Sequence, residues 1–212
     1  MMNNEANYQS TDWIQKKVDD VVSVIRGTSW KHGEISKDGV AVLTIPNIQD
    51  GRINYLTDVH LKKHISSDKR LKKGDTVAVA SSGSVKNIGR SALVDQDLNS
   101  EYTVASFLLI MRSRGEIDSS YLYYLSKSDS LKLSNYGRRA ADGKFNFQVN
   151  EFRNAVLALP SKYEQLKIAL ILSKFEQAIK WHNKIIEKTK ELKRSLMHWL
   201  FTYGLRGEEL KE

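Results

Sequence analysis

The chain has 212 residues, of which 41% are hydrophobic and none is cysteine. This length predicts one domain with or without an appended element, and the lack of cysteine excludes disulfides and thiolate metal sites, as is typical of a cytoplasmic protein. The net charge of +8 favours a nucleic-acid partner only modestly, because residues 1–160 and 161–212 share it equally, and neither a membrane span nor a signal peptide is visible.

Residues 13 to about 155 have the pattern of a mixed, strand-rich domain. One helix is expected from Asp118 to about Leu133, with Asp118 or Ser119 as its N-cap. Its buried side would hold Tyr121, Leu122, Leu125 and Leu131. Runs of alternating or β-branched residues, separated by turn signals, predict strands at Val21–Ile25, Val40–Ile45, Thr76–Ala80, Ala92–Val94 and Tyr102–Met111.

The last quarter of the chain predicts a very long helix. A short apolar strand from Val156 leads through a turn at Leu159–Ser161 into more than forty residues without Gly or Pro. Such a helix spans about 60 Å, which one small domain cannot cover, so the sequence predicts a partner. The alternative is a core helix of a larger bundle, but no second helix of matching length is visible in the chain.

The apolar stripe of this helix is wider than a two-stranded seam requires. Three positions recur in each heptad, which gives 16 positions between residues 168 and 203. Of these 16, 13 are apolar or aromatic. We therefore expect contact with another helix along the whole length and with a further surface along part of it. The residues expected to meet a partner are Leu172, Phe175, Ile179, Ile186, Leu192, Leu196, Trp199 and Leu200.

The sequence offers no catalytic or metal-binding pattern. Pro46 and Pro160 are each followed by a polar residue, which excludes the Asn/Asp-Pro-Pro-aromatic signature of amino-methyltransferases. The segment from Gly83 to Ser91 fails as a phosphate loop, because five residues separate its glycines and Arg90 stands where Lys is required. The five histidines lack metal-ligand spacing. We expect a non-catalytic protein that binds no metal.

The motifs of the chain resemble those of a known family. Leu159-Pro160, Glu164-Gln165 and the following Ile-Ala and Leu resemble the conserved region that closes each recognition domain of type I restriction-modification specificity subunits. Ser161-Lys162 departs from that pattern, since the family often has a second Pro there. Further segments resemble the family pattern in the same order: Trp13, Gly27-Thr28, Ile45–Ile48, Leu71–Asp75, Ser82–Ser84 and Leu192–Phe201.

The resemblance implies an α+β protein in two parts. Residues 1–155 would be a target recognition domain that binds one half of a split DNA site. Residues 156–212 would be a conserved region whose long helix forms an antiparallel coiled coil with a partner and sets the spacing between two half-sites. Larger members carry two such domains and two such helices, so this chain looks like a half-length subunit. A natural half-subunit and a fragment of a longer gene both remain open.

The resemblance also implies partners. The chain would form a homodimer through its C-terminal helix and bind a palindrome, or it would pair with a different half-subunit. The helices would dock methyltransferase (modification) subunits and, through them, the restriction subunit. No cofactor would be bound directly, because S-adenosylmethionine, ATP and magnesium would belong to those partners.

The resemblance transfers no base-contacting residue, so DNA-binding candidates come from side-chain chemistry. Three polar, basic loops qualify, at residues 27–32, 81–90 and 136–148, because cations, amides and hydroxyls contact phosphates and base edges. The candidates are Thr28, Lys31, Ser82, Ser84, Lys86, Asn87, Arg90, Arg138, Arg139, Lys144, Asn146 and Gln148.

Other functions compete with DNA recognition in a restriction-modification assembly. The same scaffold could serve as a stand-alone DNA-binding regulator or as an antirestriction decoy. A decoy that mimics DNA would be strongly acidic, which the charge of +8 argues against. A helix-mediated oligomerisation scaffold, whose head domain binds protein, is the alternative from a different class.

Overall fold

The computed structural model describes residues 13–49 and 51–205. The chain divides into two compact units, Met1–Ala169 and Leu170–Glu212. The first unit contains every described strand, and the second contains most of one long helix, α4 (Lys162–Tyr203). The predicted order of a strand-rich α+β domain followed by a long C-terminal helix is confirmed. The functional boundary between residues 155 and 156 stays a prediction.

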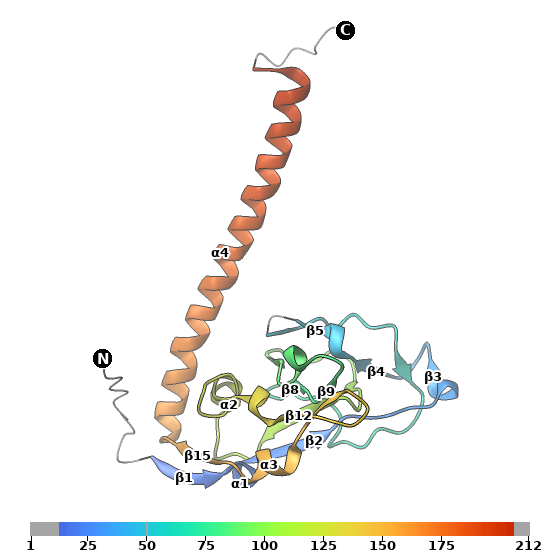
Figure 1. The fold of residues 1–212 in the computed structure, drawn as a ribbon, viewed down its shortest axis with the longest axis vertical. Helices are drawn as coiled ribbons and strands as arrows, with labels where there is room; N and C mark the ends of the chain where they lie inside the picture. Colours follow the sequence, from blue (N-terminus) through green and yellow to red (C-terminus); the bar gives the residue numbers. More distant parts are fainter. Residues whose placement is uncertain (1–12, 50, 206–212) are drawn as a thin grey trace. The chain divides into compact units, whose positions relative to one another are not determined.

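A four-stranded antiparallel sheet forms the centre of the first unit (Figure 1). Its strands lie in the order β10 (Ser91–Leu93), β8 (Thr76–Val79), β12 (Leu108–Ser113) and β2 (Val22–Arg26). The residues of β8 and the first four of β12 are all buried, as expected for strands that are covered on both faces. Three of the predicted strands therefore lie together in this core sheet.

A second four-stranded sheet explains why the single strand predicted at residues 102–111 forms two separate strands. This sheet has the order β11 (Tyr102–Val104), β4 (Val40–Leu43), β7 (His60–Leu61) and β3 (Ile35–Ser36), and only the β11–β4 pair is parallel. A turn closed by the hydrogen bond from Leu108 N–H to Ala105 O (2.8 Å) carries the chain from β11 in this sheet to β12 in the central one. The continuous strand expected from Tyr102 to Met111 is thus wrong, because the chain changes sheets within it.

Smaller sheets complete the unit. β13 (Gly137–Arg139) pairs with β14 (Phe145–Phe147), which pairs with β9 (Ser81–Ser82). β1 (Ile14–Lys17) pairs along its length with β15 (Val156–Leu159), the strand that leads into α4 (Figure 1). β5 (Ile48–Gln49) and β6 (Arg52–Ile53) form a hairpin. The short helices are α1 (Val18–Val21), α2 (Ser119–Leu125) and α3 (Val149–Asn154).

Helix α2 is shorter than the sequence suggests. Asp118 caps it as predicted, because its carboxylate accepts a hydrogen bond from Tyr121 N–H at 2.9 Å. The helix ends at Leu125, where the hydroxyl groups of Ser126 and Ser128 donate to the carbonyl groups of Tyr123 (2.7 Å) and Leu125 (2.8 Å). Serine hydroxyls compete with helical hydrogen bonding in this way. Of the four residues expected on its buried side, Leu125 is only half-buried and the other three are buried.

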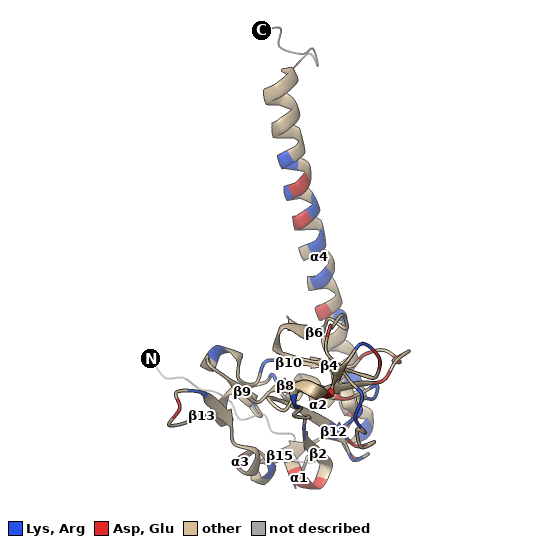
Figure 2. Cartoon of the chain, turned by 90° about the vertical axis from the view of Figure 1, so that its right-hand side faces the viewer, with Lys and Arg blue, Asp and Glu red and all other residues tan. Residues whose placement is uncertain are grey.

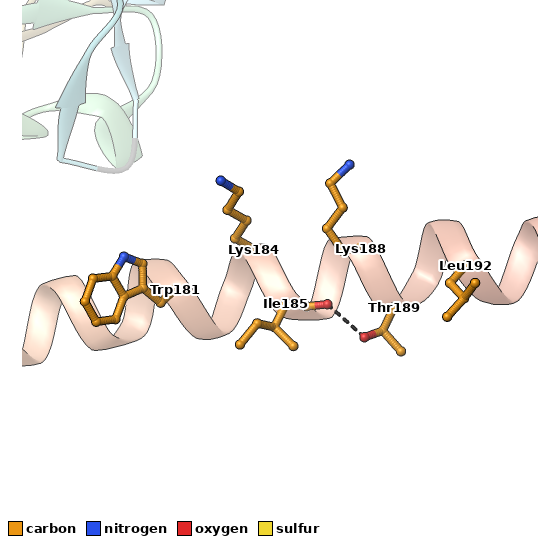
Figure 3. A pocket seen from close by; sticks show the side chains of 6 residues that line it. All are labelled: Trp181, Lys184, Ile185, Lys188, Thr189 and Leu192. Carbon is orange, nitrogen blue, oxygen red and sulfur yellow. Dashed lines mark hydrogen bonds between the residues drawn. The ribbon is translucent and has the colours of Figure 1, made fainter.

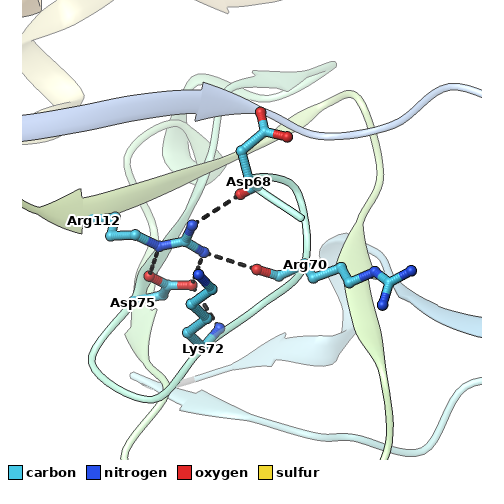
Figure 4. Close-up of polar contacts among 5 residues, drawn as sticks. All are labelled: Asp68, Arg70, Lys72, Asp75 and Arg112. Atoms are coloured by element: carbon cyan, nitrogen blue, oxygen red, sulfur yellow. Dashed lines mark hydrogen bonds and ion pairs between the residues drawn. The ribbon is translucent and has the colours of Figure 1, made fainter. Parts of the chain in front are cut away.

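A buried ion pair joins β12 to the loop before β8 (Figure 4). Arg112 contacts both carboxylate oxygens of Asp75, with Nε–Oδ1 and Nη2–Oδ2 distances of 2.7 Å. The guanidinium also donates to the carbonyl groups of Asp68 (3.0 Å) and Arg70 (2.8 Å), while Lys72 N–H donates to Asp75 Oδ2 (2.7 Å). Hydrogen bonding to this carboxylate raises the pKa of Arg112, although partial burial opposes the shift. The whole loop is therefore fixed by one arginine.

The start of α4 is anchored by a buried glutamine. Ser161 caps the helix by accepting a hydrogen bond from Glu164 N–H (3.3 Å). Gln165 is 1% exposed; its Oε1 accepts from Asp118 N–H (2.7 Å) and its Nε2 donates to the carbonyl groups of Pro160 (2.9 Å) and Glu116 (3.3 Å). These three hydrogen bonds give a structural reason for a glutamine at the second position of the Glu164-Gln165 pair. Among the described residues, no helix is long and apolar enough to cross a membrane.

Replacing Arg112 with Ala should leave the Asp75 carboxylate buried without its counter-charge. We expect a loss of about 3 kcal/mol in the free energy of unfolding, at the low end for a broken buried pair because the Arg112 side chain is 21% exposed. Denaturant unfolding of the purified chain measures this. Arg114→Ala, two residues further along, is the control and should lose less than about 0.5 kcal/mol. Equal losses in the two variants would contradict the role of the pair.

Replacing Gln165 with Ala should leave the Asp118 N–H and the Pro160 carbonyl without partners. We expect a loss of about 2 kcal/mol, measured by the same unfolding experiment. Gln177→Ala makes the same chemical change at an exposed position of α4 and should be neutral or slightly stabilising, since Ala has the higher helix propensity. A Gln165→Ala variant as stable as Gln177→Ala would show that the anchor is unimportant.

Candidate nucleic-acid interface

Two of the three candidate loops meet on one small sheet. β9 opens the loop at residues 81–90, and β14 closes the hairpin that begins with β13. The two segments are joined by the β9–β14 pairing and by the hydrogen bond from Ser81 Oγ to Asn146 Oδ1 (2.7 Å). Figure 2 marks basic residues in blue on β13 and on the segment beside β9. We call residues 81–87 and 137–146 the hairpin surface.

The third loop, at residues 27–32, does not belong to the hairpin surface. Thr28 is only 6% exposed and forms a parallel bridge with Ala105, and its N–H donates to Val104 O (2.7 Å). Lys31 is exposed, and its N–H donates to the Glu34 carboxylate (2.8 Å). The loop therefore offers one available cation, whereas Thr28 lies in the interior.

Among the candidates in and next to the first segment of the hairpin surface, some side chains form hydrogen bonds within the protein and others do not. The Ser82 hydroxyl accepts from Ser84 N–H (3.2 Å) and from Asn87 Nδ2 (3.0 Å), which shapes the turn. Arg90, just beyond the surface, is half-buried, and its Nη2 donates to Ile45 O (2.9 Å). Lys86 is exposed, with no hydrogen bond or ion pair to another described residue. Lys86 is thus the cation that this segment offers to a ligand.

The two adjacent arginines of β13 have different environments. Arg138 pairs with Glu151 (2.8 Å) and donates to Asn135 O (2.6 Å). The side chain of Arg139 is exposed and has no hydrogen bond or ion pair to another described residue, although its backbone pairs with Phe145 of β14. Neighbouring side chains of a strand point to opposite faces, so the two cations are presented differently. Arg139 is the more available of the two.

The remaining candidates lie on the strand that returns from the hairpin tip and just beyond it. Lys144 is exposed and lies 3.5 Å from the Asp142 carboxylate. Asn146 and Gln148 are half-buried, and Gln148 Nε2 donates to Asn146 O (3.3 Å). Behind them, burial raises the pKa of the Tyr136 hydroxyl, and the charge of Glu151 adds to the shift. The hairpin thus presents cations and amides above an uncharged aromatic base.

The structure adds a cleft that the sequence did not indicate. It has a volume of about 390 Å³ and lies where the ends of β2 and β12 meet the segment after β14. Arg26, Asn150 and Arg153 line it together with the candidate Gln148. Besides Gln148, the sequence held one signal for this cleft, the cation Arg26 directly before the loop at residues 27–32. In the part of the chain that the structure describes, no group of three or more His, Asp or Glu residues could hold a metal ion.

The predicted partner residues of α4 are all exposed in the single chain. Leu172, the least exposed of the eight, is 39% accessible, and Phe175 reaches 65%. Figure 3 shows part of the helix, where Ile185, Thr189 and Leu192 extend from one side and Lys184 and Lys188 from the other. A monomeric protein rarely exposes an apolar surface of this extent. The residues are placed as a partner-binding stripe requires, while their partner stays a prediction.

Known proteins with similar sequences share one description. Residues 10–191 match the family model of the type I restriction modification DNA specificity domain. The chain is 27% identical over 214 residues to a putative type I restriction enzyme MjaX specificity subunit of Methanocaldococcus jannaschii, covering 95% of this chain and 50% of that protein. The MjaVIII specificity subunit of the same organism is 26% identical over 208 residues, with 94% and 48% covered.

Solved structures share the fold at lower identity. The S subunit of a type I restriction-modification system from M. genitalium aligns with a TM-score of 0.58 and 16% identity, over 98% of this chain and 49% of that one. The HsdS subunit of Thermoanaerobacter tengcongensis aligns with a TM-score of 0.61 and 15% identity, over 96% and 48%. The chain spans about half the length of the relatives it matches. By its family match over most of its length, the chain belongs to the type I restriction modification DNA specificity domain family.

Proposed function

We propose that this chain is the DNA sequence-recognition component of a type I restriction-modification system and that it binds one half of a bipartite target. The observation that carries the proposal is the family match over residues 10–191. The hairpin surface supports it, because Lys86, Arg139 and Lys144 are exposed there beside the polar side chains of Ser84 and Asn146. Such sets of cations, hydroxyls and amides are suited to both phosphates and base edges.

The long helix supports a second part of the proposal, dimerisation. Pairing α4 with the α4 of a second copy in an antiparallel arrangement would cover apolar side chains that are now exposed. Two identical heads related by a twofold axis would then bind a palindromic pair of half-sites. The 42 residues of α4 correspond to about 63 Å of helix, so its length would set the gap between the half-sites.

The apolar stripe of α4 is wide enough to contact more than one partner. We propose that the same helices dock a methyltransferase subunit and, through it, a restriction subunit. The chain itself would be non-catalytic, and S-adenosylmethionine, ATP and magnesium would bind to those partners. A component that acts on DNA in this assembly would work in the cytoplasm.

DNA binding by the chain, assembled with its methyltransferase subunit, should weaken steeply as salt rises, because phosphate contacts release counterions. Replacing both Lys86 and Arg139 with Ala should lower the affinity for duplex DNA by about tenfold to a hundredfold. Fluorescence anisotropy with a labelled duplex measures this. Lys37→Ala with Arg52→Ala removes the same charges from exposed positions outside the hairpin surface and should change the affinity little.

Binding that is absent or independent of salt would contradict the proposed function. That result would favour an oligomerisation scaffold, in which the head domain binds protein. Retained dimers without DNA binding would point to the same alternative. A regulator on this scaffold would instead bind DNA equally well without the methyltransferase subunit.

Replacing Ile179 and Ile186 with Asp should break the dimer or the docking of the methyltransferase subunit, because the two charges would lie within the stripe that a partner would bury. Light scattering after gel filtration measures the mass, and a pulldown measures docking. The control is Gln177→Asp with Ser195→Asp, which places two charges at exposed positions on the opposite side of the helix. Unchanged mass and unchanged docking in the Ile variant would refute the role of the stripe.

A further inference from the structure

The cleft beside the hairpin surface has an apolar floor and a polar rim. Leu109 and Phe147, both buried, contribute to the floor, and Arg26, Gln148 and Asn150 contribute polar side chains. The cleft is not part of a metal site or of the partner stripe of α4. Its residues come from three separated parts of the sequence, so only folding brings them together.

Arg26 combines a fixed backbone with a free side chain. It is the last residue of β2, and its backbone still pairs with Leu109 of β12. The next residue, Gly27, passes so close to Ala105 that a Cβ on it would lie 2.2 Å from the Ala105 carbonyl oxygen. The guanidinium of Arg26 is exposed and has no hydrogen bond or ion pair to another described residue.

The second arginine of the cleft is already engaged. Arg153 Nη2 donates to Val24 O (2.9 Å), and its Nε lies 3.5 Å from the Asp19 carboxylate. Asp19 therefore forms an ion pair with Arg153, and a longer one with Arg114 (3.9 Å), whereas Arg26 has no ion pair to any described residue. The cleft keeps one uncompensated positive charge, with the amide groups of Gln148 and Asn150 nearby.

We propose that this cleft binds a phosphate group of the DNA backbone, with Arg26 as its cation and Asn150 as an amide donor. The inference rests on the proposed function, since it assigns a contact within DNA binding. A phosphodiester carries a single negative charge, which one guanidinium matches, and its two free oxygens suit the forked donors of arginine. Amide side chains are common additional phosphate ligands.

The position of the cleft agrees with this role. Gln148 lines the cleft and donates to Asn146 O, and Asn146 accepts from Ser81, so a continuous polar row joins the cleft to the hairpin surface. One duplex could therefore meet both. A phosphate held at the cleft would set the register of the duplex, while Arg139 and Lys144 approach base edges or further phosphates.

The test uses Arg26→Ala in the chain assembled with its methyltransferase subunit. We expect about tenfold weaker binding to a labelled mixed-sequence duplex at low salt, as for a lost charge-assisted hydrogen bond. The slope of log affinity against log salt should fall by about one, because one phosphate contact is lost. The loss should be the same for every duplex sequence. Arg52→Ala, an exposed arginine outside the cleft, should match the wild type in both measures.

Arg26→Lys separates charge from geometry. It should keep the salt slope and lose part of the affinity, because lysine retains the charge but not the forked donors. An unchanged slope in Arg26→Ala, or an equal change in Arg52→Ala, would overturn the cleft assignment while leaving the proposed function intact. A wild-type assembly without salt-dependent DNA binding would overturn both. The thermal midpoint of Arg26→Ala should stay unchanged, which excludes misfolding as the cause.

Discussion

The ion pair between Arg112 and Asp75 is the contact on which the position of the DNA-binding candidates depends. Arg112 belongs to β12, the strand between β8 and β2, and Asp75 directly precedes β8. Burying two charges costs much of what their attraction returns, so the pair contributes geometry more than free energy. It sets where β8 begins, and β8 leads almost directly into β9, the strand that supports the hairpin surface. The glycine before Asp75 in the Leu71–Asp75 segment has a reason of its own, since Gly74 has a φ of +90°, which favours glycine.

The hairpin rests on a rigid aromatic base. Phe147 N–H donates to Ala80 O (2.7 Å), and the rings of Tyr136, Phe147 and Phe152 pack with centroid distances of 5.2 to 5.7 Å. The Tyr136–Phe152 and Phe147–Phe152 pairs pack edge to face and the Tyr136–Phe147 pair is tilted, geometries that stabilise aromatic clusters beyond the burial of their area. Exposed cationic side chains are thereby presented from a packed aromatic platform. This arrangement lowers the entropy that binding must offset, since only side chains need to be ordered.

Local sequence patterns predicted individual helices and strands, but not the contacts between segments that lie far apart in the sequence. The long helix followed from forty residues without Gly or Pro, and the cap of α2 followed from Asp118, because both depend on neighbouring residues alone. The contact between Ser81 and Asn146 spans 65 positions, and no periodicity encodes it. Arg138 and Arg139 are neighbours of the same type in the sequence, and the folded positions of Glu151 and of the Asn135 carbonyl group distinguish them. The cleft at Arg26 escaped prediction for the same reason.

The anchor of α4 has a consequence for how specificity can change. Gln165 makes its three hydrogen bonds to the peptide groups of residues 116, 118 and 160, and none of them to a side chain. Peptide groups are present whatever residue occupies a position, apart from the missing N–H of proline. Substitutions in the hairpin surface or around the cleft therefore leave this socket intact. Under the proposed function, the residues that contact DNA could therefore vary while the start of α4 keeps all three hydrogen bonds.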